Sequence, residues 1–221
     1  MAGYNLDMTN GYYKEKTRIL VDWVGQNKTV LDLGCYDGRD SVLYVKNNNK
    51  VYGVDLLKEN TQQAAKRGII TETFNLETKK KWPYKEKFFD LVVCGDIIEH
   101  IVDVDTFLQN INEILKLNGE LIITTPNLAS IGRRLLLLFG KNPYIEVSYN
   151  ENVNGFPAVG HVKYFTIKTL STLVETYGFK VTSYTSDNIN IGKFHSIKLA
   201  KLMPTLSWRI ILKAKKIKHL K

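Results

Sequence analysis

The chain has little cysteine and no long apolar segment. Its 221 residues include two cysteines, Cys35 and Cys94, which is too few for a disulfide framework and typical of a reducing compartment. The longest run of large apolar side chains, Leu135 to Phe139, is far shorter than the ~20 residues that span a bilayer. Met1 to Asn10 lack the charged start and apolar centre of a signal peptide. These absences lead us to expect a soluble, cytoplasmic protein.

Acidic side chains are missing from the last part of the chain. From Asn188 to the end there is no Asp or Glu, but there are nine Lys and Arg residues, as many as the formal net charge of +9. Such a segment either contacts an anionic surface, a membrane or nucleic acid, or simply favours solubility. We expect residues 215–221 to form a free basic tail, which would let the protein lie peripherally on an anionic membrane surface.

Short apolar segments alternate with segments of helical period. The predicted helices are Asp40–Asn47, Lys58–Arg67, Val104–Leu117, which Asp103 can cap, and Thr166–Tyr177. The predicted strands are Thr29–Leu33, Lys50–Asp55, Ile69–Phe74, Phe89–Cys94, Gly119–Thr125, Phe179–Thr185 and Trp208–Ala214. This alternation predicts a single α/β domain over residues 1–221. Its Rossmann-like, mostly parallel, seven-stranded sheet would have helices on both faces and bind ligands at the carboxyl ends of the strands.

Residues 127–163 interrupt the alternation after the fifth strand. They hold a helix-like apolar run, Leu128 to Phe139, and then a stretch rich in Pro, Gly and Asn with several aromatic residues. An insertion at the carboxyl end of a strand lies over the ligand crevice, so we predict a substrate-side cap. The alternative is a plain surface excursion.

The stretch "VLDLGCYDGRDS", residues 30–41, predicts a turn that holds a nucleotide-like cofactor. Gly34 and Gly38 allow a tight turn and a close approach of the backbone to a ligand, and the next helix points its amides at the same place. Asp55, at the end of the next strand, can accept hydrogen bonds from both hydroxyls of a ribose. These features fit either a dinucleotide or S-adenosyl-L-methionine.

Further details separate the two cofactors. Asp32 lies within the first strand, which is usually apolar in dehydrogenases, and Ser41 stands where the dinucleotide motif has its helix-packing glycine. "FDLVVCGDIIEH" and "LNGELIITTPN" then follow in order. Together these motifs resemble the class I S-adenosylmethionine-dependent methyltransferases. The branch is the one with the coenzyme Q O-methyltransferases, small-molecule and glycan methyltransferases and MetW-like proteins. The resemblance covers Tyr12 to Thr185.

The resemblance implies S-adenosyl-L-methionine as the cofactor. The family reads D-x-G-C-G-x-G at the loop, and Tyr36 replaces the middle glycine. Its ring could face the sulfonium, narrow the amino-acid end of the pocket or fill the site. Asn75 stands where the family has an acidic residue that bonds adenine, and it can still accept through its side-chain oxygen or be a turn residue. The implied cofactor-binding residues are Asp32, Gly34, Tyr36, Gly38, Asp55, Leu56, Asn75, Leu76 and Gly95.

Candidate catalytic residues follow the fourth strand. Asp96, Glu99 and His100 would share one face of a helical turn, where they could form a base relay or hold a divalent metal. The coenzyme Q methyltransferases carry a metal-binding E-x-x-E-H there, and Asp96 shortens its first side chain. Alternatively, Glu99 and His100 only cap and orient the next helix. His161, in "GHVKYFT", is a second candidate base, although a lone histidine is often structural.

The resemblance implies O-methylation of a small molecule, a glycan or a lipid-linked precursor. Two alternatives stay open. A non-catalytic partner protein with this fold would explain Tyr36 and Asn75. A nucleic-acid methyltransferase would suit the net charge, although "CGDIIEH" is not the N-P-P-Y type of motif and no RNA-binding module is recognisable.

Overall fold

The computed structural model describes residues 11–78, 81–144, 160–191 and 194–220. Its main sheet is formed by β1 (Thr29–Leu33), β2 (Lys50–Asp55), β3 (Ile70–Thr73), β4 (Phe89–Gly95), β5 (Leu115–Pro126), β6 (Phe179–Thr185) and β9 (Arg209–Lys216). A separate hairpin pairs β7 (Ile189–Ile191) with β8 (Phe194–Ser196). The helices are α1 (Gly11–Val24), α2 (Ser41–Lys46), α3 (Lys58–Ala65), α4 (Val104–Ile114), α5 (Ile131–Leu138), α7 (Ile167–Thr176), α8 (Ile197–Leu202) and the 3-10 turns η1 (Ile98–His100) and η2 (Pro204–Leu206).

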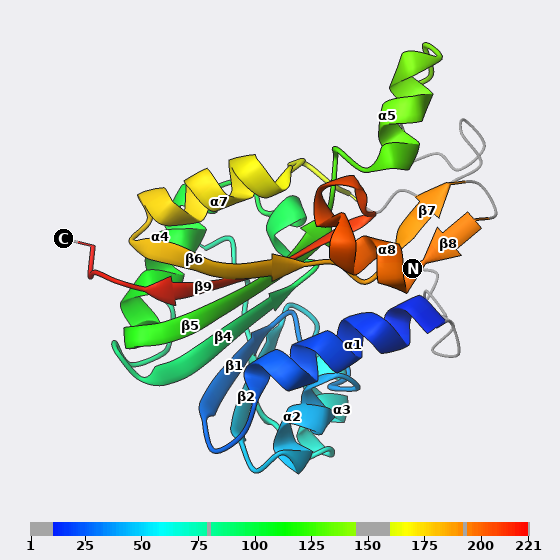
Figure 1. The fold of residues 1–221 in the computed structure, drawn as a ribbon. Coiled ribbons are helices and arrows are strands. Elements are labelled where there is room, and N and C mark those ends of the chain that lie inside the picture. Colours follow the sequence, from blue (N-terminus) through cyan, green and yellow to red (C-terminus); the bar gives the residue numbers. More distant parts are fainter. Residues whose placement is uncertain (1–10, 79–80, 145–159, 192–193, 221) are drawn as a thin grey trace.

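The sheet has the predicted seven strands, in the order β3-β2-β1-β4-β5-β9-β6 (Figure 1). β1 runs parallel to β2 and β4, and β5 runs parallel to β4. β9 alone is antiparallel to both of its neighbours. β2 and β3 lie on one side of β1, and β4 and the later strands lie on the other. The carboxyl ends of β1 and β4 therefore flank the switch point, where sheets of this kind bind ligands. The predicted Rossmann-like, mostly parallel sheet is confirmed.

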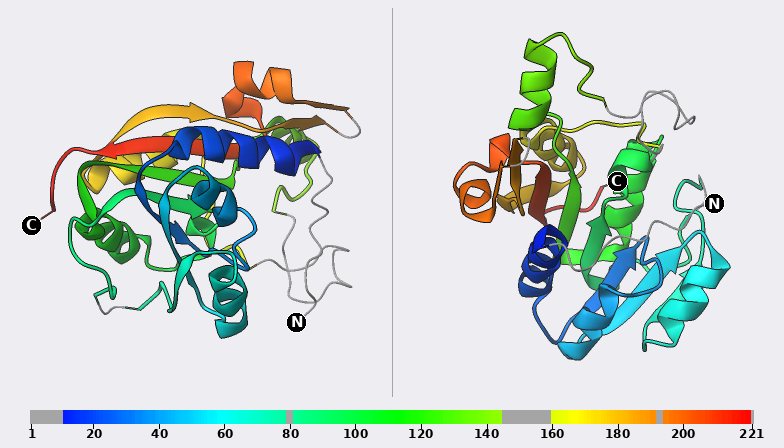
Figure 2. Two further views of the ribbon diagram at one scale, coloured as in Figure 1. Left: turned by 90° about the horizontal axis from the view of Figure 1, so that it is seen from below. Right: turned by 90° about the vertical axis from the view of Figure 1, so that its right-hand side faces the viewer.

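Two hydrophobic cores cover the two faces of the sheet. Alternate residues of a strand point to opposite faces, so Leu31 and Leu33 face α4 and α7, and Val30 faces α1 to α3. Figure 2 shows these helices in two layers with the strands between them. Phe107 on α4 and Tyr44 on α2 are fully buried, one in each core. Burying a large apolar side chain contributes about 1.5–3 kcal/mol, so both layers hold the sheet.

Helix α4 is shorter than its apolar period predicts. Asp103 accepts a hydrogen bond from the Thr106 amide at 3.0 Å, which confirms the predicted cap. The helix nevertheless ends at Ile114, and Leu115 already pairs with Phe89 as the first residue of β5. The helical period of Val104 to Leu117 was misleading there, because strand pairing takes over from Leu115.

Lys216 fastens the end of α4 to the sheet. Its side chain is completely buried, and Nζ donates to the carbonyl oxygens of Asn112 and, at 2.8 Å, of Leu115. It thereby satisfies carbonyls that the end of a helix leaves without partners. Lys215 and Lys216 both belong to β9, so the segment after the sheet begins at Ile217 and not at Lys215 as expected.

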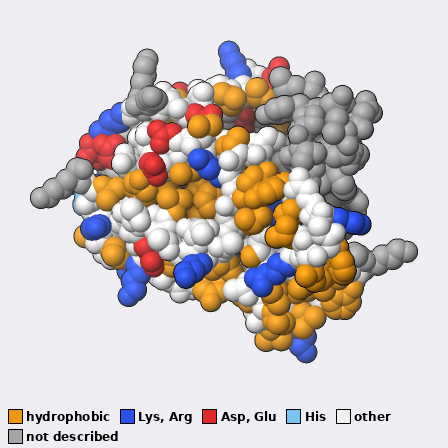
Figure 3. All heavy atoms as spheres, turned by 90° about the horizontal axis from the view of Figure 1, so that it is seen from above, with side chains coloured by type: hydrophobic (Ala, Val, Ile, Leu, Met, Phe, Trp, Pro, Cys, Tyr) orange, Lys and Arg blue, Asp and Glu red, His pale blue; other side chains and the backbone are white. Residues whose placement is uncertain are grey.

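The predicted cap begins as a helix beyond the carboxyl end of β5. Of residues 127–163, those at 127–144 and 160–163 are described, and they include α5. α5 stands clear of the sheet (Figure 1), and hydrophobic side chains gather on this end of the molecule, as Figure 3 shows from above. The prediction that the insertion forms a substrate-side cap stays a prediction.

None of the helices within the described ranges is long and apolar enough to cross a bilayer. Cys35 and Cys94 are both buried free thiols, and burial raises the pKa of each. As expected, the two cysteines form no disulfide.

The buried Lys216 yields a stability prediction. Lys216→Ala removes two hydrogen bonds from buried carbonyls and leaves a cavity, so we expect it to lower the free energy of unfolding by about 2–4 kcal/mol in urea titrations. Lys215→Ala, at the exposed neighbouring position, should change it by no more than about 0.5 kcal/mol. Equal effects of the two substitutions would show that Lys216 does not hold α4 against β9.

Candidate active site

The loop between β1 and α2 is built around two glycines. Gly34 and Gly38 have φ angles of 70° and 79°, in the left-handed region that favours glycine. A Cβ atom on Gly34 would collide with the side chain of Ile97, and one on Gly38 would lie 3.0 Å from Cα of Ala64. Both positions therefore require glycine, and the loop passes closely between its neighbours on its way into α2.

Tyr36 takes a glycine-like conformation in this loop. Its φ of 49° is left-handed, which costs a non-glycine residue of order 1 kcal/mol. Its side chain is 46% exposed, and the guanidinium carbon of Arg39 lies 4.9 Å from the centre of the ring. Asp37 holds that guanidinium at 2.9 Å. The tyrosine ring thus faces a cation of its own loop, and its predicted contact with a sulfonium stays a prediction.

Asp55 closes the loop from the end of β2. One oxygen, Oδ2, accepts from the Tyr36 amide at 3.0 Å. The other, Oδ1, accepts from the Leu57 amide and from the Asn60 side chain, both at 2.9 Å. Each carboxylate oxygen can accept about two hydrogen bonds, so Oδ2 can also receive a ribose hydroxyl, and Oδ1 can do so if the Asn60 side chain gives way. Leu56 beside it is mostly exposed.

Asp32 links β1 to the start of α2. The Ser41 hydroxyl donates to its Oδ2 at 2.5 Å, and Asp32 is almost fully buried. Burial raises the pKa of Asp32 to about 7, although the bond from Ser41 opposes the shift. The hydrogen bond to Asp32 thus explains why a serine stands where the dinucleotide motif has glycine. Through this bond Asp32 positions the loop.

Three other predicted cofactor contacts lie at or just beyond the ends of their strands. Asn75 follows β3, and its side-chain oxygen accepts from the Glu77 amide at 2.9 Å, as in a turn. Leu76 packs half-buried against the core. Gly95 ends β4 directly before Asp96. Asn75 thus has the geometry of a turn residue, which was one of the two roles expected for it. Its contact with adenine stays a prediction.

Asp96 does not join Glu99 and His100, contrary to the helical spacing. Its φ is 55° and η1 begins only at Ile98, so the three residues do not share one helical face. Its carboxylate pairs with Arg209 and, at 3.2 Å, with Lys16. Burial would raise the pKa of Asp96, but Arg209 and then Lys16 outweigh it and hold the pKa well below its usual range. Asp96 is therefore engaged as an anion by Arg209 and Lys16, and its role as a metal ligand stays a prediction.

The same charge cluster joins five parts of the chain. Thr124 on β5 donates its hydroxyl to Asp96 at 2.9 Å. Arg209, the first residue of β9, also contacts buried Asp187 at 3.0 Å, directly after β6. With Lys16 from α1, the cluster connects α1 with the carboxyl ends of β4, β5 and β6 and the start of β9. Nothing in the sequence marked Lys16 as a member of this cluster. Arg209 could have been noticed, because it is a charged residue at the start of an apolar strand.

Glu99, His100 and His161 come together beyond β4. Glu99 is 2% exposed, and Thr125 donates its hydroxyl to Oε2 at 2.9 Å. Its other oxygen, Oε1, is buried without a hydrogen-bond partner in the described part of the chain, and His161 Nε2 lies 3.9 Å from it. The rings of His100 and His161 have centres 4.8 Å apart. The two candidate bases that the sequence offered separately therefore form one group.

The end of the insertion is bound to η1. The amides of Val162 and Lys163 donate to the Glu99 carbonyl at 2.8 and 3.0 Å. His100 Nδ1 lies 3.2 Å from the Gly160 carbonyl oxygen. These bonds bring His161 beside Glu99, and no sequence spacing between residues so far apart could indicate that.

The environment of Glu99 favours its protonated form. Burial is the main cause and the nearby Asp96 charge the next, and together they raise the pKa of Glu99 to about 8. A carboxyl group that is mostly protonated at neutral pH and half-protonated near pH 8, beside two imidazoles, can exchange a proton with them or with a bound hydroxyl.

The same three side chains could hold a metal. One ligand atom from each of Glu99, His100 and His161 lies within 4.8 Å of the other two, and a carboxylate with two imidazoles suits divalent transition metals. Ligand atoms on one such ion lie only about 3.3 Å apart, so the group would have to contract. The donor atoms of Glu99, His100 and His161 fit a metal. The third member of this group is His161, whereas the sequence predicted Asp96.

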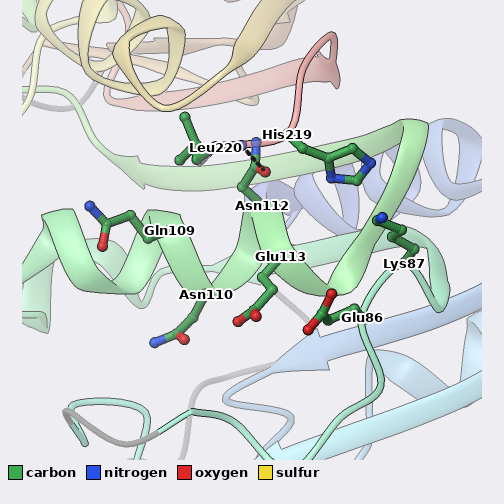
Figure 4. Close-up of a pocket in the computed structure, with 8 residues that line it drawn as sticks. All are labelled: Glu86, Lys87, Gln109, Asn110, Asn112, Glu113, His219 and Leu220. Atoms are coloured by element: carbon green, nitrogen blue, oxygen red, sulfur yellow. Dashed lines mark hydrogen bonds between the residues drawn. The ribbon is translucent and has the colours of Figure 1, made fainter.

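The opposite edge of the sheet carries a polar pocket of about 410 Å³ (Figure 4). Its lining carries both signs of charge, from Glu86, Glu113 and Lys87, and three neutral amide side chains. These residues lie near the starts of β4 and β5, whereas the loop after β1 lies at the carboxyl ends of the strands. None of the predicted site residues lines it, so the carboxyl edge remains the candidate active site.

Known proteins resemble this chain in sequence and in fold. Residues 5–184 match the methyltransferase domain family. Human mitochondrial ubiquinone biosynthesis O-methyltransferase is 26% identical over 165 residues, 69% of this chain and 41% of the relative. The enzyme of that name from Pelagibacter ubique is 30% identical over 105 residues, 46% and 43% of the two chains. This chain thus spans less than half the length of these curated relatives.

Solved structures share the fold. An S-adenosylmethionine-dependent methyltransferase from Mesorhizobium loti has a TM-score of 0.65 at 16% identity, covering 94% of this chain and 99% of that one. Magnesium protoporphyrin IX methyltransferase from Synechocystis, with bound S-adenosylhomocysteine, has a TM-score of 0.63 at 15% identity, covering 93% and 84%. With the domain match over most of its length, this chain belongs to the methyltransferase domain family and has the fold of the S-adenosylmethionine-dependent methyltransferases.

Proposed function

We propose that the protein transfers a methyl group from S-adenosyl-L-methionine to a hydroxyl group of a small molecule. The observation that carries the proposal is the Asp55 carboxylate. Three donors fix it at the end of β2, beside the loop of Gly34 and Gly38. A fixed carboxylate next to a close-approaching backbone at the switch point suits a ribose. The O-methyltransferase relatives support the same reaction.

The bound cofactor would supply an electrophilic methyl group, and the chain's own residues would prepare the acceptor. Methyl transfer mainly requires alignment, and a hydroxyl acceptor must also lose its proton. In our proposal His161 accepts that proton, because its Nε2 is the imidazole nitrogen beside the unpartnered oxygen of Glu99. Ionised Glu99, the form present above its pKa of about 8, can then take the proton from His161. His100, held by the Gly160 carbonyl, orients the segment that carries His161.

A divalent metal on Glu99, His100 and His161 is the alternative route. It would polarise the acceptor hydroxyl and lower its pKa. Proton transfer needs one pair of atoms, His161 Nε2 and Glu99 Oε1, to close from 3.9 Å to hydrogen-bond distance, whereas a metal needs all three side chains to contract from 4.8 Å. We therefore propose proton transfer.

The acceptor is proposed by class only. The two O-methyltransferase relatives are named for ubiquinone biosynthesis, and the apolar helix α5 follows directly after the carboxyl end of β5. Both points favour an amphiphilic acceptor, such as a lipid-linked precursor, over a free glycan or a nucleic acid. A cytoplasmic protein that works at a membrane surface would meet such an acceptor.

Calorimetry with S-adenosylhomocysteine tests cofactor binding. We expect the wild-type protein to bind S-adenosylhomocysteine with a dissociation constant on the order of micromolar and not to bind NADH. Asp55→Asn should weaken binding about tenfold or more, because hydrogen bonds to a charged group contribute about 1.5–3 kcal/mol. Glu59→Gln, on the exposed start of α3, is the matched control. If the wild-type protein binds nothing, Tyr36 closes the site and the non-catalytic interpretation replaces this proposal.

His161→Ala tests the base. With labelled S-adenosylmethionine and a panel of phenols, sugars and lipid-linked alcohols, kcat should fall about 10²–10⁴-fold on any accepted compound while cofactor binding is kept. His195→Ala, on the exposed hairpin strand β8, should keep full activity. Activity should also survive a chelator. Loss of activity in EDTA, restored by an added divalent ion, would contradict proton transfer and support the metal.

Glu99 also makes stability depend on pH. Its pKa rises from 4.5 to about 8 on folding, so the folded state holds an extra proton between these values and Glu99 makes the protein less stable as pH rises through them. In urea titrations at about pH 5 and about pH 8, Glu99→Gln should lose much of that decline, on the order of 2 kcal/mol. Glu72→Gln, an exposed acid on β3, should change nothing. A decline unchanged in Glu99→Gln would mean that Glu99 is already ionised.

A further inference from the structure

We propose that one face of the protein docks onto an anionic membrane surface, and that this face is not the basic tail. The docking face combines the end of α5 with the hairpin β7–β8 and with α8. Its exposed apolar side chains are Leu137, Leu138, Phe139, Ile191, Phe194, Leu202 and Met203.

The end of α5 is unusually apolar for a surface. Leu137, Leu138 and Phe139 are consecutive, and they are 65%, 75% and 74% exposed. A groove of about 420 Å³ lies between α5 and Ile191 of β7 and is lined mainly by further apolar side chains. α5 stands clear of the sheet (Figure 1). Successive helical residues point about 100° apart, so these exposed consecutive side chains lie on more than one side of its end. Contiguous exposed apolar surface of this kind marks an interaction site.

The described segments that carry these side chains contribute only positive charges. Residues 127–144 and 188–216 contain no Asp or Glu. Arg134, Lys141 and Lys198 are exposed on the same elements. Figure 3 shows Lys and Arg side chains between the hydrophobic ones on this end of the molecule. Apolar side chains that insert between headgroups, with cations that attract anionic lipid, are the features of a membrane-surface helix.

These features favour a bilayer over a second copy of the chain. Two docking faces brought together would place like charges such as Arg134, Lys141 and Lys198 against one another, which is unfavourable. A flat partner would also leave one side of the projecting helix end in water, whereas a bilayer surrounds it. The face adjoins the carboxyl edge, since α5 follows β5 and Trp208 bonds Asn127 and Asn188 there.

The basic tail lies at the other edge of the sheet. β9 runs antiparallel to β5, so its last residue, Lys216, lies near the start of β5, and Lys216 is buried. In Figure 1 the C-terminus and α5 lie at opposite ends of the molecule. The tail is therefore separate from the docking face, and the apolar side chains assign the contact to α5.

Vesicle co-sedimentation of the whole protein tests the docking face. We expect binding to vesicles of equal parts phosphatidylglycerol and phosphatidylcholine, and much weaker binding to phosphatidylcholine alone. Replacing Leu137, Leu138 and Phe139 together by Ser should weaken binding about tenfold or more. Replacing Leu117 and Ile217 by Ser is the matched control, because both are 52% exposed at the opposite edge and should not matter.

Charge reversal separates the face from the tail. Lys141→Glu with Lys198→Glu should weaken binding to the anionic vesicles severalfold, and more at low salt. Lys215→Glu at the end of β9 with Lys218→Glu in the tail should not. Three results would overturn the proposal. One is no binding of wild-type protein to anionic vesicles. Another is loss of binding only in the tail variant. The third is a protein dimer in solution that the triple Ser substitution dissolves.

Docking and cofactor binding can be told apart. Calorimetry with S-adenosylhomocysteine on the triple Ser variant should give the wild-type affinity, because α5 contributes none of the proposed cofactor contacts. Docking can hold even where the proposed methyl transfer fails, because vesicle binding needs neither cofactor nor acceptor.

Discussion

The ion pairs of Arg209 with Asp96 and Asp187 determine how the carboxyl edge of the sheet is organised. β9 enters the sheet in the opposite direction to its neighbours, so its first residue lies beside the ends of β4, β5 and β6. A guanidinium at that point needs anions, and Asp96 and Asp187 supply them. Asp96 takes a left-handed backbone conformation while making this contact, and η1 starts only afterwards.

This arrangement divides the candidate active site at the carboxyl edge into two parts. On one side, the β1 loop and Asp55 form a fixed cradle of backbone and carboxylate. On the other, η1 and the end of the insertion bring Glu99, His100 and His161 together. Asp96 stays charged and engaged between them, and its charge helps to keep a proton on Glu99. The Asp96 anion and the candidate proton-transfer group are thus neighbours with opposite protonation states.

The sequence predicted the elements whose signals are local. Six of the seven strands lie within a few residues of their predicted bounds because apolar runs between turn residues mark buried strands, and Gly34, Gly38 and Asp55 are recognisable by spacing alone. The seventh, β5, begins four residues early, where α4 gives way to strand pairing with Phe89. Local pattern could not show that Asp96 would leave the helical face, that Lys216 would be buried or that His161 would reach Glu99. Each depends on contacts between distant parts of the chain.

Tyr36 decides whether the crevice works as a methyltransferase site. Its ring packs with Arg39, and its amide helps to hold Asp55. The most direct measurement is a crystal structure of the protein grown with excess S-adenosylhomocysteine. The account predicts density with the ribose hydroxyls on the Asp55 carboxylate and the sulfur directed toward Glu99 and His161. An empty crevice, with the Tyr36 ring lying where the ligand should be, would contradict it.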